Sequence, residues 1–242
     1  MTVQQKPFHY VPRSVKAFLF LSLSFQIFWH HQFPPLRGQI QQLPYPPSIE
    51  QLRIFSLGDS VAGAKLLMLW LQSFDNQGGN FLSYRQLNYT TLKAWLEQIL
   101  LLDPHSQYPL LVASHIYSVT PDSKGVRLMS EFIYEKFFED PHQRWPWLSQ
   151  AAILAKHRLK DLPLALKYAQ AIAKHSTPNM PFWAREMRIF ILEELGELEQ
   201  ARLIVGGLLA SGQIEDANEI KFLDGKLHEL EAKSTKKNIP IP

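Results

Sequence analysis

The chain has 242 residues, of which 46% are hydrophobic and 19% are charged, and it contains no cysteine. This composition excludes an intrinsically disordered chain, because there is ample apolar surface to form a core. The lack of cysteine excludes a disulfide framework, a thiolate metal site and a cysteine nucleophile. The sequence also holds 17 prolines, and their positions divide it into segments.

The net charge of +3 is unevenly distributed. Residues 1–53 carry five basic side chains and one acidic side chain, whereas the rest of the chain carries 20 basic and 21 acidic side chains. A protein that binds nucleic acid needs basic residues clustered on its folded surface. Because most of this chain is neutral, we expect no nucleic-acid partner.

The segment from Ser14 to Trp29 is apolar, with basic residues on its N-terminal side and two histidines after it. We expect a transmembrane helix over 14–31 and a cytoplasmic tail over 1–13, because basic residues flank the cytoplasmic side of membrane helices. Sixteen helical residues span about 24 Å of a hydrocarbon core of about 30 Å, so the histidines would lie at the interface. The alternatives are a cleaved signal peptide and a buried helix of a soluble domain.

This orientation predicts a single-pass protein of the inner or plasma membrane, with its C-terminal domain outside the cytoplasm. Segment 32–52 is rich in proline and has no apolar periodicity. Its prolines are Pro34, Pro35, Pro44, Pro46 and Pro47. Such a sequence favours extended, semi-rigid chain, so we expect a linker that holds the following domain away from the membrane.

Residues 53–233 contain a repeat of about 36 residues. Three prolines that are expected to follow helix ends, Pro104, Pro141 and Pro178, are 37 residues apart. Apolar quartets spaced 3, 4, 3 recur with nearly the same period, and each predicts one buried helix face. The quartets are Leu92-Trp95-Ile99-Leu102, Leu162-Ala165-Ala169-Ile172 and Leu198-Ala201-Val205-Leu208, with an incomplete one at Val126-Met129-Ile133 that ends on Lys136.

Each period has room for two helices, so we expect an all-α array of about four antiparallel helix hairpins over 53–233. The partner helices are expected at about Ser60–Phe74, Ser106–Tyr117, Gln143–Arg158 and Met180–Leu195. Residues 214–232 carry one apolar stripe, Ile220-Leu223-Leu227-Leu230, under a polar face, which is typical of a terminal capping helix. The tail over 234–242 is expected to be disordered.

Two turns of this array resemble those of tetratricopeptide repeat (TPR) proteins. Residues Glu194–Ala201 match the turn in which a glycine joins two helices and an alanine lets them pack closely. Residues Leu159–Ala165 resemble the same turn one period earlier, with Lys160 in the usual place of the glycine. The resemblance implies a TPR-like α-solenoid whose concave surface binds protein segments.

Residues Gly58-Asp59-Ser60-Val61 resemble the nucleophile block of the GDSL/SGNH hydrolases, in which a strand delivers the serine. The chain has no Gly-x-Asn-Asp block, and its late Asp224 and His228 are four residues apart on an expected helix. The same residues could instead cap the next helix. We therefore expect no enzyme, and a membrane-tethered serine hydrolase that uses Ser60 stays as the alternative.

The nine histidines show no metal-binding spacing, and the sequence has no Walker A or Gly-x-Gly-x-x-Gly motif. We therefore expect no metal and no cofactor. The remaining candidate is the concave groove, which in TPR-like folds is lined by the first helix of each hairpin. Here those helices carry Lys156, His157, Arg158, Arg185 and Arg188.

Arg185 and Arg188 are three residues apart and share a helix face. We predict a basic groove for an acidic or carboxylate-ended peptide, with a solvated helix face as the alternative. The expected function is that of a membrane-anchored, TPR-like scaffold or adaptor for protein–protein interaction in a bacterial-type cell envelope. The oligomeric state stays open.

Overall fold

The structure is a computed structural model. It describes residues 11–32, 42–74, 87–120, 122–177, 179–212 and 214–237. Within these ranges the regular structure is α-helical, apart from a short 3-10 turn, and contains no strand. The expected all-α class is therefore confirmed. The chain divides into two compact units, of which the first contains helix α1 and the second contains helices α2 to α12.

Helix α1 (Arg13–Gln32) covers the segment expected to be transmembrane and extends it by one residue at each end. It has no buried residue, and its ten large apolar side chains from Val15 to Trp29 are each at least half exposed. In the part of the chain that the structure describes, no single helix combines the length and the apolar character of a membrane span. Helices α2 and α3 reach this length and apolar character only when they are taken together, and the pair is bent by 101° at the break between them.

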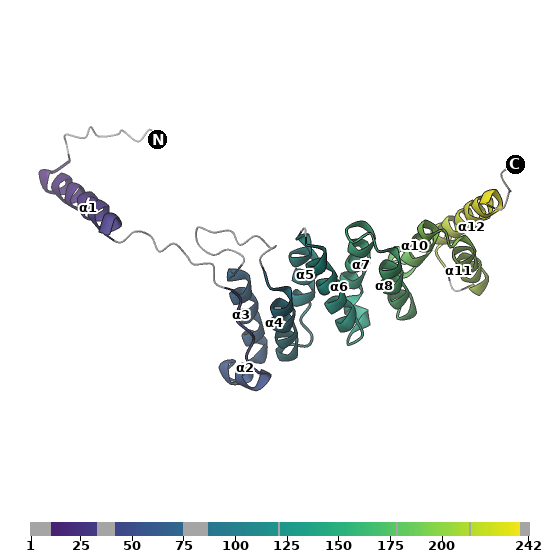
Figure 1. Ribbon diagram of the computed structural model, residues 1–242, viewed down its shortest axis with the longest axis horizontal. Helices are drawn as coiled ribbons and strands as arrows, with labels where there is room; N and C mark the ends of the chain where they lie inside the picture. Colours follow the sequence, from purple (N-terminus) through teal and green to yellow (C-terminus); the bar gives the residue numbers. More distant parts are fainter. Residues whose placement is uncertain are drawn as a thin grey trace. The chain divides into compact units, whose positions relative to one another are not determined.

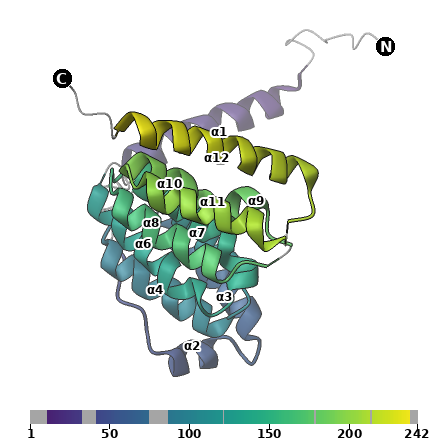
Figure 2. The same cartoon turned by 90° about the vertical axis from the view of Figure 1, so that its right-hand side faces the viewer.

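The second unit is a succession of helices in which each helix contacts the next along the chain. Their bounds are α2 (Ile49–Phe55), α3 (Ser60–Ser73), α4 (Tyr89–Leu102), α5 (Tyr108–His115), α6 (Ser123–Phe137), α7 (Pro141–His157), α8 (Leu162–Lys174), α9 (Phe182–Arg185), α10 (Met187–Leu195), α11 (Leu198–Ser211) and α12 (Ala217–Lys237). Next-but-one helices are also in contact, such as α4 with α6, α5 with α7 and α8 with α10. Figures 1 and 2 show α3 to α8 lying side by side in chain order.

The repeated apolar stripes face the core as predicted. All four stripe residues of α4 are buried, and in α6 the buried Phe137 completes the stripe where Lys136 breaks the pattern. In α8 and α11 the central members are completely buried, while the first members, Leu162 and Leu198, are half-buried. The stripes therefore face the neighbouring helices of the second unit.

Small residues set how closely neighbouring helices approach. On α6 this residue is Gly125, because a Cβ at that position would lie 2.8 Å from the ring of Tyr89 on α4. The Tyr89 ring is buried, and its hydroxyl donates to the backbone carbonyl of Tyr117 at 3.1 Å. In α8 and α11 the small residues of the stripes are Ala165 and Ala201, which are both completely buried.

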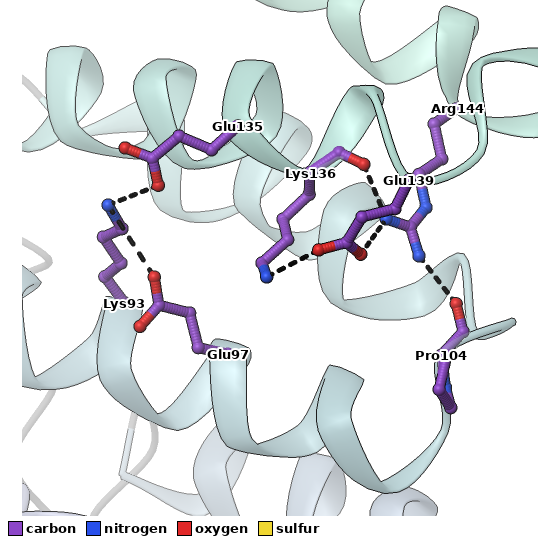
Figure 3. Close-up of polar contacts among 7 residues, drawn as sticks. All are labelled: Lys93, Glu97, Pro104, Glu135, Lys136, Glu139 and Arg144. Carbon is purple, nitrogen blue, oxygen red and sulfur yellow. Dashed lines mark hydrogen bonds and ion pairs between the residues drawn. The ribbon is translucent and has the colours of Figure 1, made fainter.

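The buried guanidinium of Arg144, on α7, links successive hairpins (Figure 3). Its side chain is 1% exposed. Its Nη2 donates to the carbonyl of Pro104 at 2.6 Å, and its Nη1 donates to the carbonyl of Lys136 and to Oε2 of Glu139, both at 2.6 Å. Burial would raise the pKa of Glu139, but the hydrogen bonds from Lys136 and Arg144 hold it below its usual value. Arg144 therefore satisfies the carbonyls of the two turns that precede it.

The N-terminal boundary of the second unit lies earlier than expected. Helix α2 begins at Ile49, inside the segment 32–52 that was expected to be linker, and Ser48 and Gln51 form its capping box. Residues 42–48 before it are not helical, as their prolines predict, and this segment is docked on the second unit. Leu43 is buried, and Nε1 of Trp95 donates to the carbonyl of Pro44 at 2.7 Å. Residues 33–41 lie outside the described part.

Two helices differ from the expected bounds. The helix expected over Met180–Leu195 consists of α9 and α10, which meet at the buried Glu186. Helix α7 begins at Pro141, so Pro146 lies in its second turn, and not in the first turn as expected. Proline has no N–H, so the carbonyl one turn earlier loses its helical partner there. Pro178 lies outside the described residues.

The capping helix α12 is longer than expected and is rotated about its axis. It continues to Lys237, so residues 234–237 of the tail expected to be disordered are helical, and 238–242 lie outside the described part. Leu223 and Leu230 of the predicted stripe are buried, but Ile220 is exposed, and Lys226 is buried instead. These leucines belong to a separate apolar cluster that α12 forms with α10 and α11.

Candidate functional site

An open groove of about 450 Å³ lies along α12, and we call it the α12 groove. Its lining residues are Asn218, Lys221, Phe222, Gly225, Lys226 and Glu229. Phe222 is 44% exposed, and its ring centroid lies 6.0 Å from that of Phe182 and 6.1 Å from that of Phe190. A Cβ at Gly225 would meet nothing within 4 Å, so the groove is open there. The groove thus combines exposed aromatic surface with polar side chains.

Two lysines and two glutamates form an ion-pair cluster beside this groove. Lys226, which is 9% exposed, bonds Glu193 of α10 at 2.5 Å and Glu229 at 3.0 Å. Lys233 bonds the same two carboxylates, at 2.5 Å in the case of Glu229. Each charge is therefore shared between two partners, and the cluster attaches α12 to α10.

The cluster keeps its carboxylates ionised. Hydrogen bonds from Lys233 and Lys226 lower the pKa of Glu229 to about 2. Burial would raise the pKa of Glu193, but the hydrogen bonds from the same lysines outweigh it and hold the pKa below its usual value. The bonds to Glu193 and Glu229 raise the pKa of Lys233 to about 12. At neutral pH the positive charge of Lys226 is therefore neutralised within the molecule.

Lys221 differs from Lys226, because no carboxylate in the described ranges pairs with it. Its side chain is exposed in the α12 groove, one residue before Phe222. An ammonium group beside an exposed aromatic ring can bind a carboxylate or backbone carbonyls while the ring contacts an apolar side chain. Asn218 adds an amide that can both donate and accept. The arrangement can therefore bind an extended peptide segment.

Of the five basic residues predicted from the sequence, Arg185 lies beside this groove. Its guanidinium bonds Glu219 of α12 at 3.4 Å and lies 5.8 Å above the ring of Phe182, which itself contacts Phe222. The buried Nε of Arg185 has no hydrogen-bond partner among the described residues. Arg185 thus helps to position α12.

The next predicted residue, Arg188, pairs with the buried Glu186 at the junction of α9 and α10, with distances of 3.3 Å from Nε and 3.2 Å from Nη2. Burial raises the pKa of Glu186, and the favourable interactions with Arg188 and Arg185 only partly offset this. Arg188 therefore offsets the cost of burying the carboxylate of Glu186.

The remaining predicted residues lie at the end of α7. Lys156 bonds Glu194 of α10 at 2.5 Å, His157 is exposed, and Arg158 donates to the carbonyls of Ser118 and Thr120 at 3.1 and 2.7 Å. Glu194, the partner of Lys156, lies six residues after Arg188 on α10, so the two residues are about 9 Å apart along the helix axis. The structure thus brings Arg185 to the α12 groove, while Lys156 and Arg158 bond toward other segments.

Lys221, Phe222 and Lys226 were not predicted as site residues from the sequence, because α12 was expected to present a wholly polar outer face. The one indication in the sequence is Phe222, which lies outside the 3, 4, 3 stripe and among charged residues. Which of these charges is buried depends on the rotation of α12 against α10, and the stripe predicted that rotation incorrectly at Ile220.

Ser60, the candidate nucleophile, is the first residue of α3. The carboxylate of Asp59 caps this helix by accepting from the N–H of Ala62 at 2.9 Å, and Ile54 and Phe55 end helix α2 where the hydrolase resemblance implies a strand. In the described part of the chain no hydrogen bond joins Ser60 to a histidine. The same part contains no group of three histidine or carboxylate side chains that could hold a metal ion.

Comparison with protein families, curated proteins and solved structures gives no match for this chain. The likeness to TPR proteins therefore depends on the two turns and the helical period alone. Within the described residues, the α12 groove is the candidate functional site.

Proposed function

We propose that the second unit is a TPR-like α-solenoid that acts as a scaffold and binds an extended protein segment in the α12 groove. The repeated stripes and the contacts between next-but-one helices support the solenoid. The turns at Lys160 and Gly196 support its TPR-like character, because both residues have a left-handed backbone, with φ of 55° and 78°.

The observation that carries the binding proposal is the half-exposed ring of Phe222 in an open groove beside an unpaired ammonium. Aromatic residues are over-represented among the residues that dominate binding energy at interfaces. Since Lys226 is neutralised by Glu193 and Glu229, Lys221 supplies the net positive charge. The preferred ligand is therefore a segment with an apolar side chain next to an acidic side chain or a C-terminal carboxylate.

We also propose that α1 anchors the protein as a single pass in the inner or plasma membrane, with the second unit outside the cytoplasm. Twenty helical residues extend about 30 Å, close to the thickness of the hydrocarbon core. Arg13 and Lys16 lie at its N-terminal end and the exposed Trp29 at the other, which agrees with the basic and aromatic flanks of membrane helices.

Peptide binding tests the groove directly. The full chain is presented with matched peptide libraries that end in a free carboxylate or in an amide. In each library the acidic side chains are likewise either free carboxylates or amides. We expect selective retention of the carboxylate peptides, which Phe222→Ala and Lys221→Ala should each weaken about 10-fold or more. Phe138→Ala serves as the control, because Phe138 has almost the same exposure, 45%, but follows α6. Equal retention of both libraries, or equal losses in all variants, would contradict the proposal.

Two further experiments test the remaining elements. A reporter that is active only outside the cytoplasm is fused to the C-terminus, and activity is expected if the orientation is correct. A serine-directed fluorophosphonate probe is expected not to react with the protein. Labelling that disappears in Ser60→Ala would replace the scaffold with a hydrolase.

A further inference from the structure

Helices α2 and α3 carry apolar side chains on the face that points away from the core. These side chains are between 45% and 93% exposed, and we call them the α2–α3 face: Ile54, Phe55, Leu57, Val61, Leu66 and Leu69. The opposite face of α3 is apolar as well, since Ala64, Met68 and Leu71 are buried. Helix α3 is therefore apolar on both sides, although only one side packs on α4.

This composition differs from that of the other end of the second unit. An end helix of a repeat array normally presents a polar outer face to water. Helix α12 does so with many charged residues, whereas α3 has Lys65 as its one charged residue. An exposed apolar surface of this kind on a soluble end helix indicates contact with another apolar phase.

The corner between α2 and α3 is held in a fixed shape, and a small hollow of about 110 Å³ lies between the two helices, lined in part by Phe55 and Leu66. The two helices bend by 101°, and Leu57 and Gly58 at the corner have φ of 49° and 90°. A Cβ at Gly63 would lie 2.1 Å from Oγ of Ser56, so glycine is what allows α2 and α3 to approach here. Leu57 is 93% exposed in a backbone conformation that disfavours leucine. Within the described chain this strained, exposed leucine contributes no packing.

We propose that the α2–α3 face inserts into the interfacial region of the lipid bilayer. This inference rests on the proposed anchoring by α1. Ten residues, 33–42, separate Gln32 from the docked Leu43 and can span at most about 40 Å, which limits how far the second unit can lie from an anchored α1. A lipid surface is deformable and can cover both the exposed corner and the hollow beside it. A rigid protein would have to supply a matching shape.

The charges of this segment indicate how it binds. Glu50, Arg53, Asp59 and Lys65 are exposed and sum to zero. Anionic lipids would therefore add little attraction, and apolar burial is the driving force. We expect the insertion to occur equally on zwitterionic and on anionic membranes.

The absence of cysteine allows a direct test on the full chain. Three single-cysteine variants are labelled with an environment-sensitive fluorophore and reconstituted in phosphatidylcholine vesicles: Leu57→Cys at the corner, Phe20→Cys in α1 and Leu203→Cys in α11, whose leucine is 67% exposed. Lipids with a spin label near the headgroup should quench the fluorescence of the label at Leu57→Cys at least two-fold more than that of the label at Leu203→Cys. Lipids labelled deep in the acyl chain should quench Phe20→Cys.

The outcomes separate the two proposals. Quenching of Phe20→Cys with no difference between Leu57→Cys and Leu203→Cys would overturn the insertion and leave the anchor intact. A lack of lipid quenching at Phe20→Cys would overturn the anchor, whatever Leu57→Cys reports. If the fluorophore at Leu57→Cys were shielded from aqueous iodide but not quenched by the spin-labelled lipids, protein would cover the face. If its fluorescence were quenched by the lipids only in anionic vesicles, charge would drive the contact. Both results would overturn the inference.

Discussion

Lys160 and Gly196 have the same left-handed backbone conformation and lie 36 positions apart, each directly before the N-cap residue of the next helix. Glycine adopts this conformation without strain, whereas a lysine loses about 1–2 kcal/mol in it. The turn between α7 and α8 therefore has the geometry of a glycine turn without the glycine. The period of the repeat extends to the backbone dihedral angles.

Exchange of these two residue types should have opposite effects on stability. Lys160→Gly removes the left-handed strain of an exposed lysine and should raise the free energy of unfolding by about 0.5–1 kcal/mol, after the entropy that glycine adds to the unfolded chain. Gly196→Lys should lower it by a similar amount. Urea denaturation measures both. If both variants changed stability in the same direction, the two turns would not be equivalent.

Two other glycines give a matched pair of alanine substitutions. Gly125→Ala places a methyl group 2.8 Å from the buried Tyr89 ring and should destabilise the protein by about 1–3 kcal/mol, because the contact of α4 with α6 becomes overpacked. Gly207 lies on helix α11, where a Cβ would meet nothing within 4 Å. Gly207→Ala should therefore stabilise the protein by up to about 1 kcal/mol, because alanine favours the helix. Unfolding midpoints in urea compare the two, and a neutral Gly125→Ala would show that the ring can move away.

The buried Arg144 acts mainly through backbone carbonyls. Arg144→Met should cost about 2–4 kcal/mol, because the carbonyl of Pro104 loses the guanidinium donor inside the protein and the carbonyl of Lys136 keeps only backbone donors such as the N–H of Glu139. Glu139→Gln should cost about 1 kcal/mol or less, because this carboxylate is half exposed and its ion pair is screened by water. Chemical denaturation of both variants gives the comparison. Equal costs would mean that the ion pair, and not the bonds to the carbonyls, carries the effect.

The attachment of α12 should weaken in acid. Glu229 has a pKa of about 2 in the folded protein, below its usual value near 4.5, so its stabilisation is fully present above about pH 5 and is lost as the pH falls toward 2. Glu193, whose pKa is also lowered, acts in the same direction. Hydrogen exchange of α12 amides, corrected for intrinsic rates, should accelerate between pH 6 and pH 3 more than that of α4 amides. Glu229→Gln should reduce this difference, and an unchanged difference would assign the effect elsewhere.

Much of the fold follows from local features of the sequence. The 3, 4, 3 stripes and the positions of the prolines predicted the all-α class and, to within a few residues, most of the helices, because helix propensity and proline geometry act over one or two turns. The resemblance of Leu159–Ala165 to a TPR turn predicted the turn at Lys160. Local features also predicted a helix over 14–31, which α1 confirms as a helix.

Tertiary packing decided what local patterns cannot encode. The predicted basic groove is largely paired internally, since Lys156, Arg185 and Arg188 each have a carboxylate partner in the same chain. Two of these partners lie on other helices, so their identity depends on which faces meet and at what rotation. The same holds for the burial of Lys226 and the exposure of Phe222. Charges far apart in sequence acquire partners only when helices pack, and that is why the sequence determined the helices but the tertiary structure decided the groove.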